Sequence, residues 1–267
     1  MTNNRPLILI SNDDGFQAKG ISALIRFLRP IGDIVVVAPD VARSGYATAL
    51  TIKSPLHFSK VRQEVGLTVY KCTGTPTDCV KLAVSTILSR TPDLVIGGIN
   101  HGDNSGVNIH YSGTMGIALE GAINNIPSIG FSLCNYSQDA DFTPCGPYVK
   151  KIVNQVLQNG LPKMTCLNVN FPDTPEYKGI KICSQSKTQW VKEYEPFTHP
   201  FGETFYWMAG YMENLDPKNT ENDAWALANG YVALVTAKVD LTDYALNEKM
   251  EQWDWSLPTK KEEQSLL

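Results

Sequence analysis

The sequence predicts an α/β fold in which helices on both faces cover a doubly wound, mostly parallel sheet. Short continuous runs of apolar residues recur along the chain, as expected of strands buried on both faces. Each run ends in a polar, turn-forming segment, and several of these lead into a stretch with the apolar spacing of an amphipathic helix. Repeated strand–loop–helix units of this kind build a parallel sheet through right-handed crossovers.

The first unit begins with an apolar strand at residues 7–10 and the polar turn 11–15. A helix follows, because four apolar residues fall at i, i+3, i+4 and i+7, and Pro30 ends it. These four residues are Ile21, Leu24, Ile25 and Leu28. A second buried strand at residues 34–37 leads into the polar loop 41–46.

The next helix has a clear start signal after short strands expected within residues 51–72, one of them around 67–72. Thr75 is the predicted N-cap, Pro76 the first helical residue, and Asp78 the acidic partner of a capping box. The apolar positions of this helix are Val80, Val84, Ile87 and Leu88.

A strand at residues 94–96 and a long polar loop complete the regular alternation with one more helix, and past residue 145 the pattern is less regular. Met115, Ala118, Leu119 and Ala122 mark a helix that begins near Thr114. The remaining expected elements are a helix around 149–156, strands at 166–171, 180–184, 205–208 and 231–235, and a short helix within 241–253.

All five tryptophans lie between Trp190 and Trp255. We therefore divide the chain into a catalytic α/β domain, residues 1–189, and a C-terminal β-hairpin and helix extension, residues 190–267. Aromatic residues are enriched at interfaces, so the extension is expected to form a homodimer or homotetramer. Trp207, Trp225, Trp253 and Trp255 are interpreted as core or subunit-interface residues.

Composition excludes several classes of protein. With 43% apolar and 19% charged residues, the chain is neither disordered, collagenous nor a coiled coil. No apolar run approaches ~20 residues, so no membrane span is expected. A net charge of −4 disfavours binding to nucleic-acid polymers. Six cysteines without a C-x-x-C pair, and no signal-peptide core, favour free thiols in the cytoplasm.

Oxygen-bearing side chains follow the predicted strands at the edge where α/β proteins bind ligands. They are Asp13 and Asp14 after the first strand, Ser44 after the second, and Asn100 after the strand at 94–96. Carboxylate, hydroxyl and amide oxygens suit Mg²⁺ or Mn²⁺ better than zinc. The alternative is a simple turn closed by an Asx hydrogen bond. Asn100 at a second strand end favours the metal site.

Two glycine-rich loops, residues 100–106 and 111–116, flank the helix that begins near Thr114. Its free N–H groups and positive dipole end suit a phosphate, and the alternative is an ordinary cap with a flexible loop. No dinucleotide or ATP-binding glycine motif is present. His101 and His110 lie near this site, either to protonate a leaving group or as solvated loop residues.

Five ordered motifs between residues 7 and 121 together resemble the SurE (survival protein E) family of nucleotidases. They are residues 8–15 with Gly20 and Ile21, residues 36–40 with Ser44 and Gly45, residues 74–80, residues 97–100 with Gly102 and Asn104, and residues 111–114 with Gly116. A weaker likeness continues from Asp223 to Thr242, where the family's usual Thr-Pro is Thr236-Ala237.

The resemblance implies a Rossmann-like core with a C-terminal part that forms dimers or tetramers. It implies a metal-dependent 5′-nucleotidase that hydrolyses nucleoside monophosphates, with 3′-nucleotides and short polyphosphates left open. One divalent ion per subunit, Mg²⁺ or Mn²⁺, would be held by Asp13, Asp14, Ser44 and Asn100, and the two aspartates would be catalytic. The expected substrate-binding residues are Asn104, Ser112, Gly113 and Thr114.

Three other functions are alternatives to a 5′-nucleotidase. A haloacid-dehalogenase-type phosphatase needs D-x-D after its first strand, whereas Asp13 and Asp14 are adjacent. A signalling receiver domain needs only ~120 residues and a lysine on a late strand, and no lysine closely follows residues 94–96. A non-catalytic nucleotide-binding protein is distinguished only by assay. For base recognition, the candidates near the ligands are Tyr46 and Tyr111, which could stack on any base.

Overall fold

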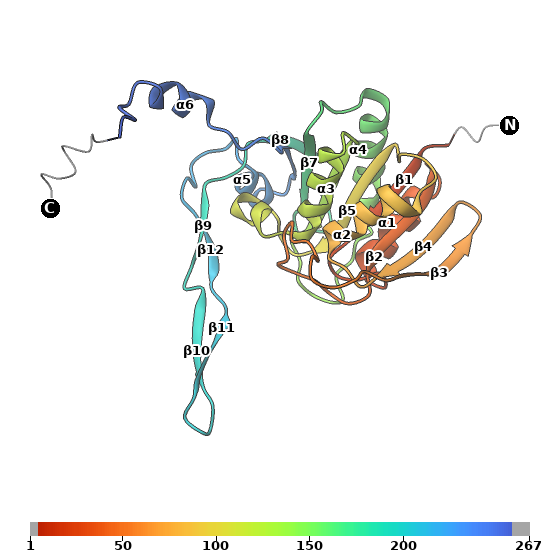
Figure 1. Cartoon of the computed structure of the whole chain (residues 1–267), viewed down its shortest axis with the longest axis horizontal. Helices are drawn as coiled ribbons and strands as arrows, with labels where there is room; N and C mark the ends of the chain where they lie inside the picture. The colour runs from red at the N-terminus through yellow and green to blue at the C-terminus, as the bar shows by residue number, and fades with distance from the viewer. Residues whose placement is uncertain (1–4, 258–267) are drawn as a thin grey trace, which may run out of the picture.

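The computed structural model describes residues 5–257, which form an α/β body with a long two-stranded arm (Figure 1). The body is built on a nine-stranded sheet of order β3-β4-β2-β1-β5-β6-β7-β13-β8. Its strands are β1 (Leu7–Ser11), β2 (Asp33–Pro39), β3 (Phe58–Glu64), β4 (Leu67–Cys72), β5 (Leu94–His101), β6 (Ser128–Leu133), β7 (Thr165–Phe171), β8 (Ile180–Cys183) and β13 (Val232–Lys238). Most neighbouring strands are parallel, and the β3–β4 and β7–β13 pairs are antiparallel.

Helices cover both faces of this sheet, as expected. The helices are α1 (Lys19–Leu28), α2 (Pro76–Leu82), α3 (Gly113–Ile123), α4 (Cys145–Asn159), α5 (Asp223–Ala228) and α6 (Tyr244–Met250), with a short π-helix at Ala83–Ile87 and a 3₁₀ turn at Gly106–His110. Helix α6 has no buried residue and lies away from the sheet (Figure 1). Helices α1 and α4 pack together on one face, and α2 and α3 pack together on the other.

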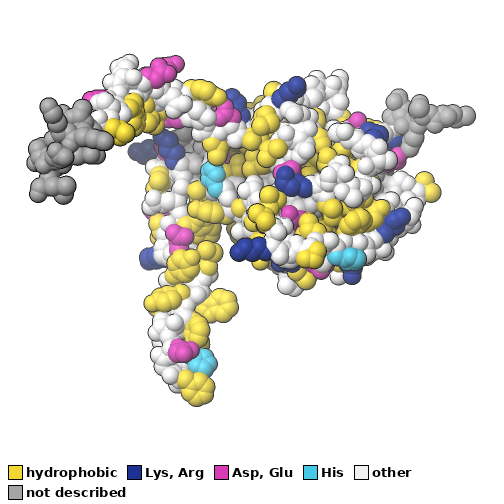
Figure 2. Space-filling view, viewed as in Figure 1, with side chains coloured by type: hydrophobic (Ala, Val, Ile, Leu, Met, Phe, Trp, Pro, Cys, Tyr) yellow, Lys and Arg dark blue, Asp and Glu magenta, His cyan; other side chains and the backbone are white. Residues whose placement is uncertain are grey.

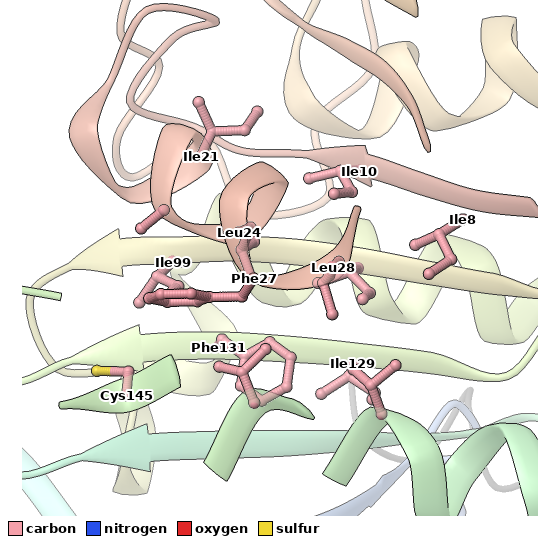
Figure 3. Packing of buried hydrophobic residues seen from close by; sticks show 14 of the residues in the cluster. Ile8, Ile10, Ile21, Leu24, Phe27, Leu28, Ile99, Ile129, Phe131 and Cys145 are labelled. Atoms are coloured by element: carbon pink, nitrogen blue, oxygen red, sulfur yellow. The ribbon is translucent and has the colours of Figure 1, made fainter. Parts of the chain in front are cut away.

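The period of two along β1 assigns its residues to the two faces. Ile8 and Ile10 pack in the same cluster as Leu24 and Phe27 of α1, as Figure 3 shows. Leu9 instead joins the cluster under α2 and α3. Strand β1 is thus buried on both sides, which explains its unbroken apolar sequence.

Strand β6 was not anticipated from the sequence. Its residues alternate apolar side chains with Ser128, Gly130 and Ser132, so no continuous apolar run marks it, although all six residues are buried. It lies between β5 and β7 and therefore occupies the middle of the sheet. Helix α5 and three strands of the arm, β9 (Thr188–Val191), β10 (Tyr194–Thr198) and β12 (Tyr211–Asn214), were also not anticipated.

The expected division at residue 189 does not coincide with an edge of the main sheet. The chain leaves the sheet after β8, forms the arm, and returns with β13, which lies between β7 and β8. The arm consists of β9 (Thr188–Val191), β10 (Tyr194–Thr198), β11 (Thr204–Met208) and β12 (Tyr211–Asn214). Figure 1 shows it projecting well beyond the body.

Three of the tryptophans expected in a core or interface are exposed in this chain. Trp207 on the arm is 71% exposed, and Trp253 and Trp255 after α6 stack on each other at the surface. The core interpretation is therefore wrong for these three residues. Within residues 5–257, no helix is long and apolar enough to cross a bilayer.

Candidate metal and phosphate site

The two adjacent aspartates follow β1 in a tight turn at the carboxyl edge of the sheet. The Asn12 side-chain amide donates to the Gly15 carbonyl over 2.9 Å and closes this turn. The Arg43 backbone N–H donates to the Asp13 carbonyl over 2.6 Å, which joins the loop after β2 to the same turn. Asp13 and Asp14 therefore lie in a hydrogen-bonded turn, and this turn is compatible with a metal site at the same two residues.

Asp13 is buried, with only 3% of its surface exposed. The Thr114 hydroxyl donates to Asp13 Oδ1 over 2.8 Å. A Cβ atom built on Gly113 would lie 2.8 Å from the Asp13 Cβ, so only glycine permits this approach. The first turn of α3 thus packs directly against Asp13.

Asp14 and Asn100 belong to neighbouring strand ends, because β1 pairs with β5. The backbone N–H of His101 donates to Asp14 Oδ2 over 3.3 Å. The Asn100 side-chain amide nitrogen donates to the Gly102 carbonyl over 3.0 Å. This hydrogen bond does not use the side-chain oxygen, which is the candidate ligand atom. Asp14 and Ser44 line one cleft of about 510 Å³.

The electrostatics of the pair favour the neutral acid. Burial raises the pKa of Asp13 to about 6, the Asp14 carboxylate adds to this rise, and the Thr114 hydrogen bond opposes it. Burial also raises the pKa of Asp14, against the hydrogen bond from His101. A cation bound beside the buried Asp13 carboxylate and the partly buried Asp14 carboxylate would stabilise both as anions.

A hard divalent cation fits this donor set. Asp13, Asp14, Ser44 and Asn100 offer carboxylate, hydroxyl and amide oxygens, and neither thiolate nor imidazole is among them. Asp13 is buried beside a second carboxylate, and a bound cation would supply the positive charge that favours its ionised form.

The predicted substrate-binding residues lie around the start of α3 and the loop after β5. Ser112 is the N-cap of α3, and its hydroxyl accepts from the Met115 backbone N–H over 3.0 Å. The Thr114 hydroxyl is directed to Asp13, so it positions that carboxylate.

Asn104 is held in a buried polar network. Its side-chain amide donates to Ser132 Oγ over 2.7 Å, and its backbone N–H donates to Asn170 Oδ1 over 2.9 Å. The Asn168 side-chain amide in turn donates to the Asn104 carbonyl over 2.8 Å. These contacts fix the glycine-rich loop above the ends of β6 and β7.

The two histidines near the site differ. The His101 ring packs edge-on against Phe142, and its Nδ1 lies 3.0 Å from the Ser137 carbonyl. His110 is exposed at the end of the 3₁₀ turn. His101 therefore connects the aspartate turn to the loop after β6.

Four residues with polar side chains that line the cleft are not predicted from the sequence: Gln17, Lys19, Tyr136 and Gln138. Tyr136 and Gln138 follow β6, and that strand was itself not anticipated. Recognising β6 would have placed them at the same sheet edge as the aspartates. Tyr46 and Tyr111 are not among the residues that line this cleft.

Comparisons with known proteins agree with the motif resemblance. A family model described as survival protein SurE matches residues 8–192. The chain is 57% identical over 254 residues to a Bacteroides fragilis protein named 5′-nucleotidase SurE, with 95% of this chain and 100% of that protein covered. A protein of the same name from Caldanaerobacter subterraneus is 40% identical over 250 residues, with 92% and 96% covered.

The fold likeness extends over nearly the whole chain. The crystal structure of the SurE protein from Aquifex aeolicus matches with a TM-score of 0.80 and 38% identity, covering 92% of this chain and 98% of that one. Motifs, family model and fold agree, and the chain belongs to the SurE family.

Proposed function

We propose that the protein is a metal-dependent 5′-nucleotidase that hydrolyses nucleoside monophosphates to nucleoside and phosphate. The observation that carries this proposal is the adjacent pair of Asp13, buried against the first turn of α3, and Asp14, which is partly buried and lines the cleft. The relatives named 5′-nucleotidase SurE support the substrate class.

Asp13, Asp14, Ser44 and Asn100 would hold one divalent ion per subunit, Mg²⁺ or Mn²⁺. When bound, the ion supplies the positive charge that a phosphate dianion needs beside two carboxylates. Phosphoryl transfer passes through a loose transition state, so the protein contributes mainly positioning and electrostatic stabilisation.

The chain's own groups divide this work. The hydrogen bond from the Thr114 hydroxyl fixes the Asp13 carboxylate. Either Asp13 or Asp14 would orient the attacking water. Backbone N–H groups around Ser112 and Gly113, at the positive end of α3, face the remaining phosphate oxygens. Asn104 holds the loop that borders the substrate.

Phosphate release tests the proposal. AMP, GMP, CMP and UMP are incubated with the protein, with EDTA and with added Mg²⁺ or Mn²⁺. We expect release from all four, lost in EDTA and restored by metal. Because stacking is tolerant of base identity, kcat/KM should vary by only about tenfold among them. No release, or release unaffected by EDTA, contradicts the proposal, and a thousandfold preference contradicts the tolerance.

The proposal also covers the oligomeric state, the cellular location and the binding partners of the protein. A homodimer or homotetramer is supported by the exposed aromatic side chains of the arm. A cytoplasmic location is supported by six cysteines that are all free thiols. Neither a nucleic-acid polymer nor a membrane is an expected partner.

A further inference from the structure

The cleft beside Asp14 is lined by more residues than those proposed to bind the metal and the phosphate. It measures about 510 Å³, within the range of small-molecule sites. Asp14 and Ser44 contribute to its lining, and so do Gln17 before α1 and Tyr136 and Gln138 after β6. A substrate whose phosphate lies at Asp14 and Ser44 can extend its remaining atoms into this cleft.

Tyr136 is held in place by the glycine-rich loop. A Cβ atom built on Gly102 would lie 2.3 Å from the nearest Tyr136 ring atom, and Gly102 has a φ of +112°. The ring therefore packs directly on the backbone of a residue that has to be glycine. The Tyr136 hydroxyl also accepts from the Asp103 backbone N–H over 3.4 Å.

The same residue remains 71% exposed, so the ring is supported on one side and open on the other. An aromatic ring fixed in this way loses little conformational entropy when a ligand stacks on it. Tyr46, by comparison, lies under the Arg43 guanidinium, 5.7 Å from the ring centroid, and does not line the cleft.

We infer that this cleft is the nucleoside subsite and that Tyr136 is the platform on which the base stacks. The inference rests on the proposed function, because it assigns the part of the substrate that the metal and phosphate groups do not contact. Lys19 also lines the cleft, and its ammonium pairs with Asp139 over 2.8 Å, which suits an uncharged base.

The glutamines explain why such a subsite would accept several bases. A side-chain amide has both donors and an acceptor, so Gln17 and Gln138 can pair with the edges of different bases or with ribose hydroxyls. Stacking is itself tolerant of base identity and is worth ~1–3 kcal/mol per base. Tyr136 would therefore set affinity for nucleosides over other phosphomonoesters.

The test compares AMP with ribose 5-phosphate, which has the same phosphate and sugar and no base. Steady-state kinetics are measured in saturating metal for the wild type and for Tyr136→Ala, Tyr136→Phe and Tyr46→Ala. We expect Tyr136→Ala to lower kcat/KM for AMP roughly 5- to 150-fold, mainly through KM. Its kcat/KM for ribose 5-phosphate should stay within twofold of wild type, and Tyr136→Phe and Tyr46→Ala should retain AMP activity.

Each other outcome has a defined meaning. An unchanged KM for AMP in Tyr136→Ala overturns the inference. An equal loss on AMP and ribose 5-phosphate also overturns it, because Tyr136 then only supports the glycine-rich loop. A larger loss in Tyr46→Ala places the base elsewhere. A wild-type protein that hydrolyses none of the nucleotides refutes the proposed function and the subsite with it, whereas the first three results refute the subsite alone.

Discussion

Asp13 shows how one residue combines a structural cost with a function. Its carboxylate is buried beside a second carboxylate, and the hydrogen bonds it accepts from the Thr114 hydroxyl and from backbone N–H groups only partly stabilise the charge. A position selected for stability alone would be neutral there. The arrangement is typical of sites where a cation or substrate supplies the missing interaction.

Removing either charge should abolish activity while the fold persists. Asp13→Asn and Asp14→Asn keep the side-chain size and lose the anionic ligands, so we expect phosphate release to fall at least 100-fold, on the order of losing a metal-held reaction step. Asp173→Asn, an exposed aspartate after β7, is the matched control and should remain active. Wild-type turnover by either site variant in saturating metal would contradict the metal assignment.

Asn100→Ala tests the fourth ligand separately. Loss of its side-chain oxygen should raise the metal concentration needed for half-maximal activity and lower kcat. A metal titration identical to that of the wild type would mean that Asn100 serves only to bond the Gly102 carbonyl.

The raised pKa of Asp13 also predicts a pH dependence for the metal-free protein. Its pKa is about 6 in the folded protein, against 3.8 for an ordinary aspartate, so the folded state binds the proton more tightly between these values. The free energy of unfolding should therefore fall as pH rises from about 4 to about 6, by at most roughly 3 kcal/mol.

Urea denaturation in EDTA, repeated across this pH range, measures the effect. Asp13→Asn lacks the titrating group, so its stability should exceed that of the wild type above pH 6, and the difference should shrink toward pH 4. A difference that does not vary with pH would show that the Asp13 carboxylate titrates normally.

At the scale of elements, the residues at the start of helix α2 determine where the helix begins and also hold a neighbouring loop in place. Thr75 Oγ1 accepts from the Asp78 backbone N–H over 3.1 Å, and Asp78 Oδ2 accepts from the Thr75 N–H over 2.9 Å. The Thr75 hydroxyl also donates to the Ala49 carbonyl over 2.7 Å. The predicted capping box is confirmed, and it joins the 41–51 loop to α2.

Loss of this cap should cost measurable stability. We expect Thr75→Ala to lower the free energy of unfolding by about 0.5–2 kcal/mol, because an N-cap hydrogen bond is lost. Thr86→Ala, at an exposed threonine in the π-turn after α2, should change it by less than about 0.5 kcal/mol. Equal urea midpoints for Thr75→Ala and the wild type would contradict the role of the cap.

At the scale of the whole molecule, the arm is the feature that the body does not need for its own core. Tyr194, Phe205, Tyr206 and Trp207 are all exposed along β10 and β11. Figure 2 shows hydrophobic side chains along this arm. Exposed apolar surface of this extent is typical of protein–protein interfaces, so we expect the proposed oligomer to form through the arm.

The arm should hold the oligomer together. Truncation before Trp190 would also remove β13 from the main sheet, so the cleaner change replaces residues 194–208 with an Asn-Gly turn. We expect this variant to sediment as a monomer at micromolar concentration, with the unfolding midpoint of the body retained. A monomeric wild type, or identical sedimentation of the two proteins, would refute the prediction.

The sequence alone was sufficient wherever the deciding interactions are local. Apolar runs located β1 and β2, and the Thr75–Asp78 pair located the start of α2. Polar residues directly after predicted strands gave Asp13, Asp14, Ser44 and Asn100 as candidate metal ligands, which stay a prediction. Each of these signals depends on residues within a few positions of one another, where periodicity and capping chemistry act.

Tertiary structure decided whatever depends on pairing between distant segments. The return of β13 to a place between β7 and β8, the burial of Asp13 under α3, and the position of Tyr136 on Gly102 each join residues at least 34 positions apart, as Gly102 and Tyr136 are. Contacts of this kind produce no periodic pattern in the sequence, because the two residues come into contact only after the sheet has formed. The paired aspartates could thus be read from the sequence, whereas the cleft beside them exists only in the fold.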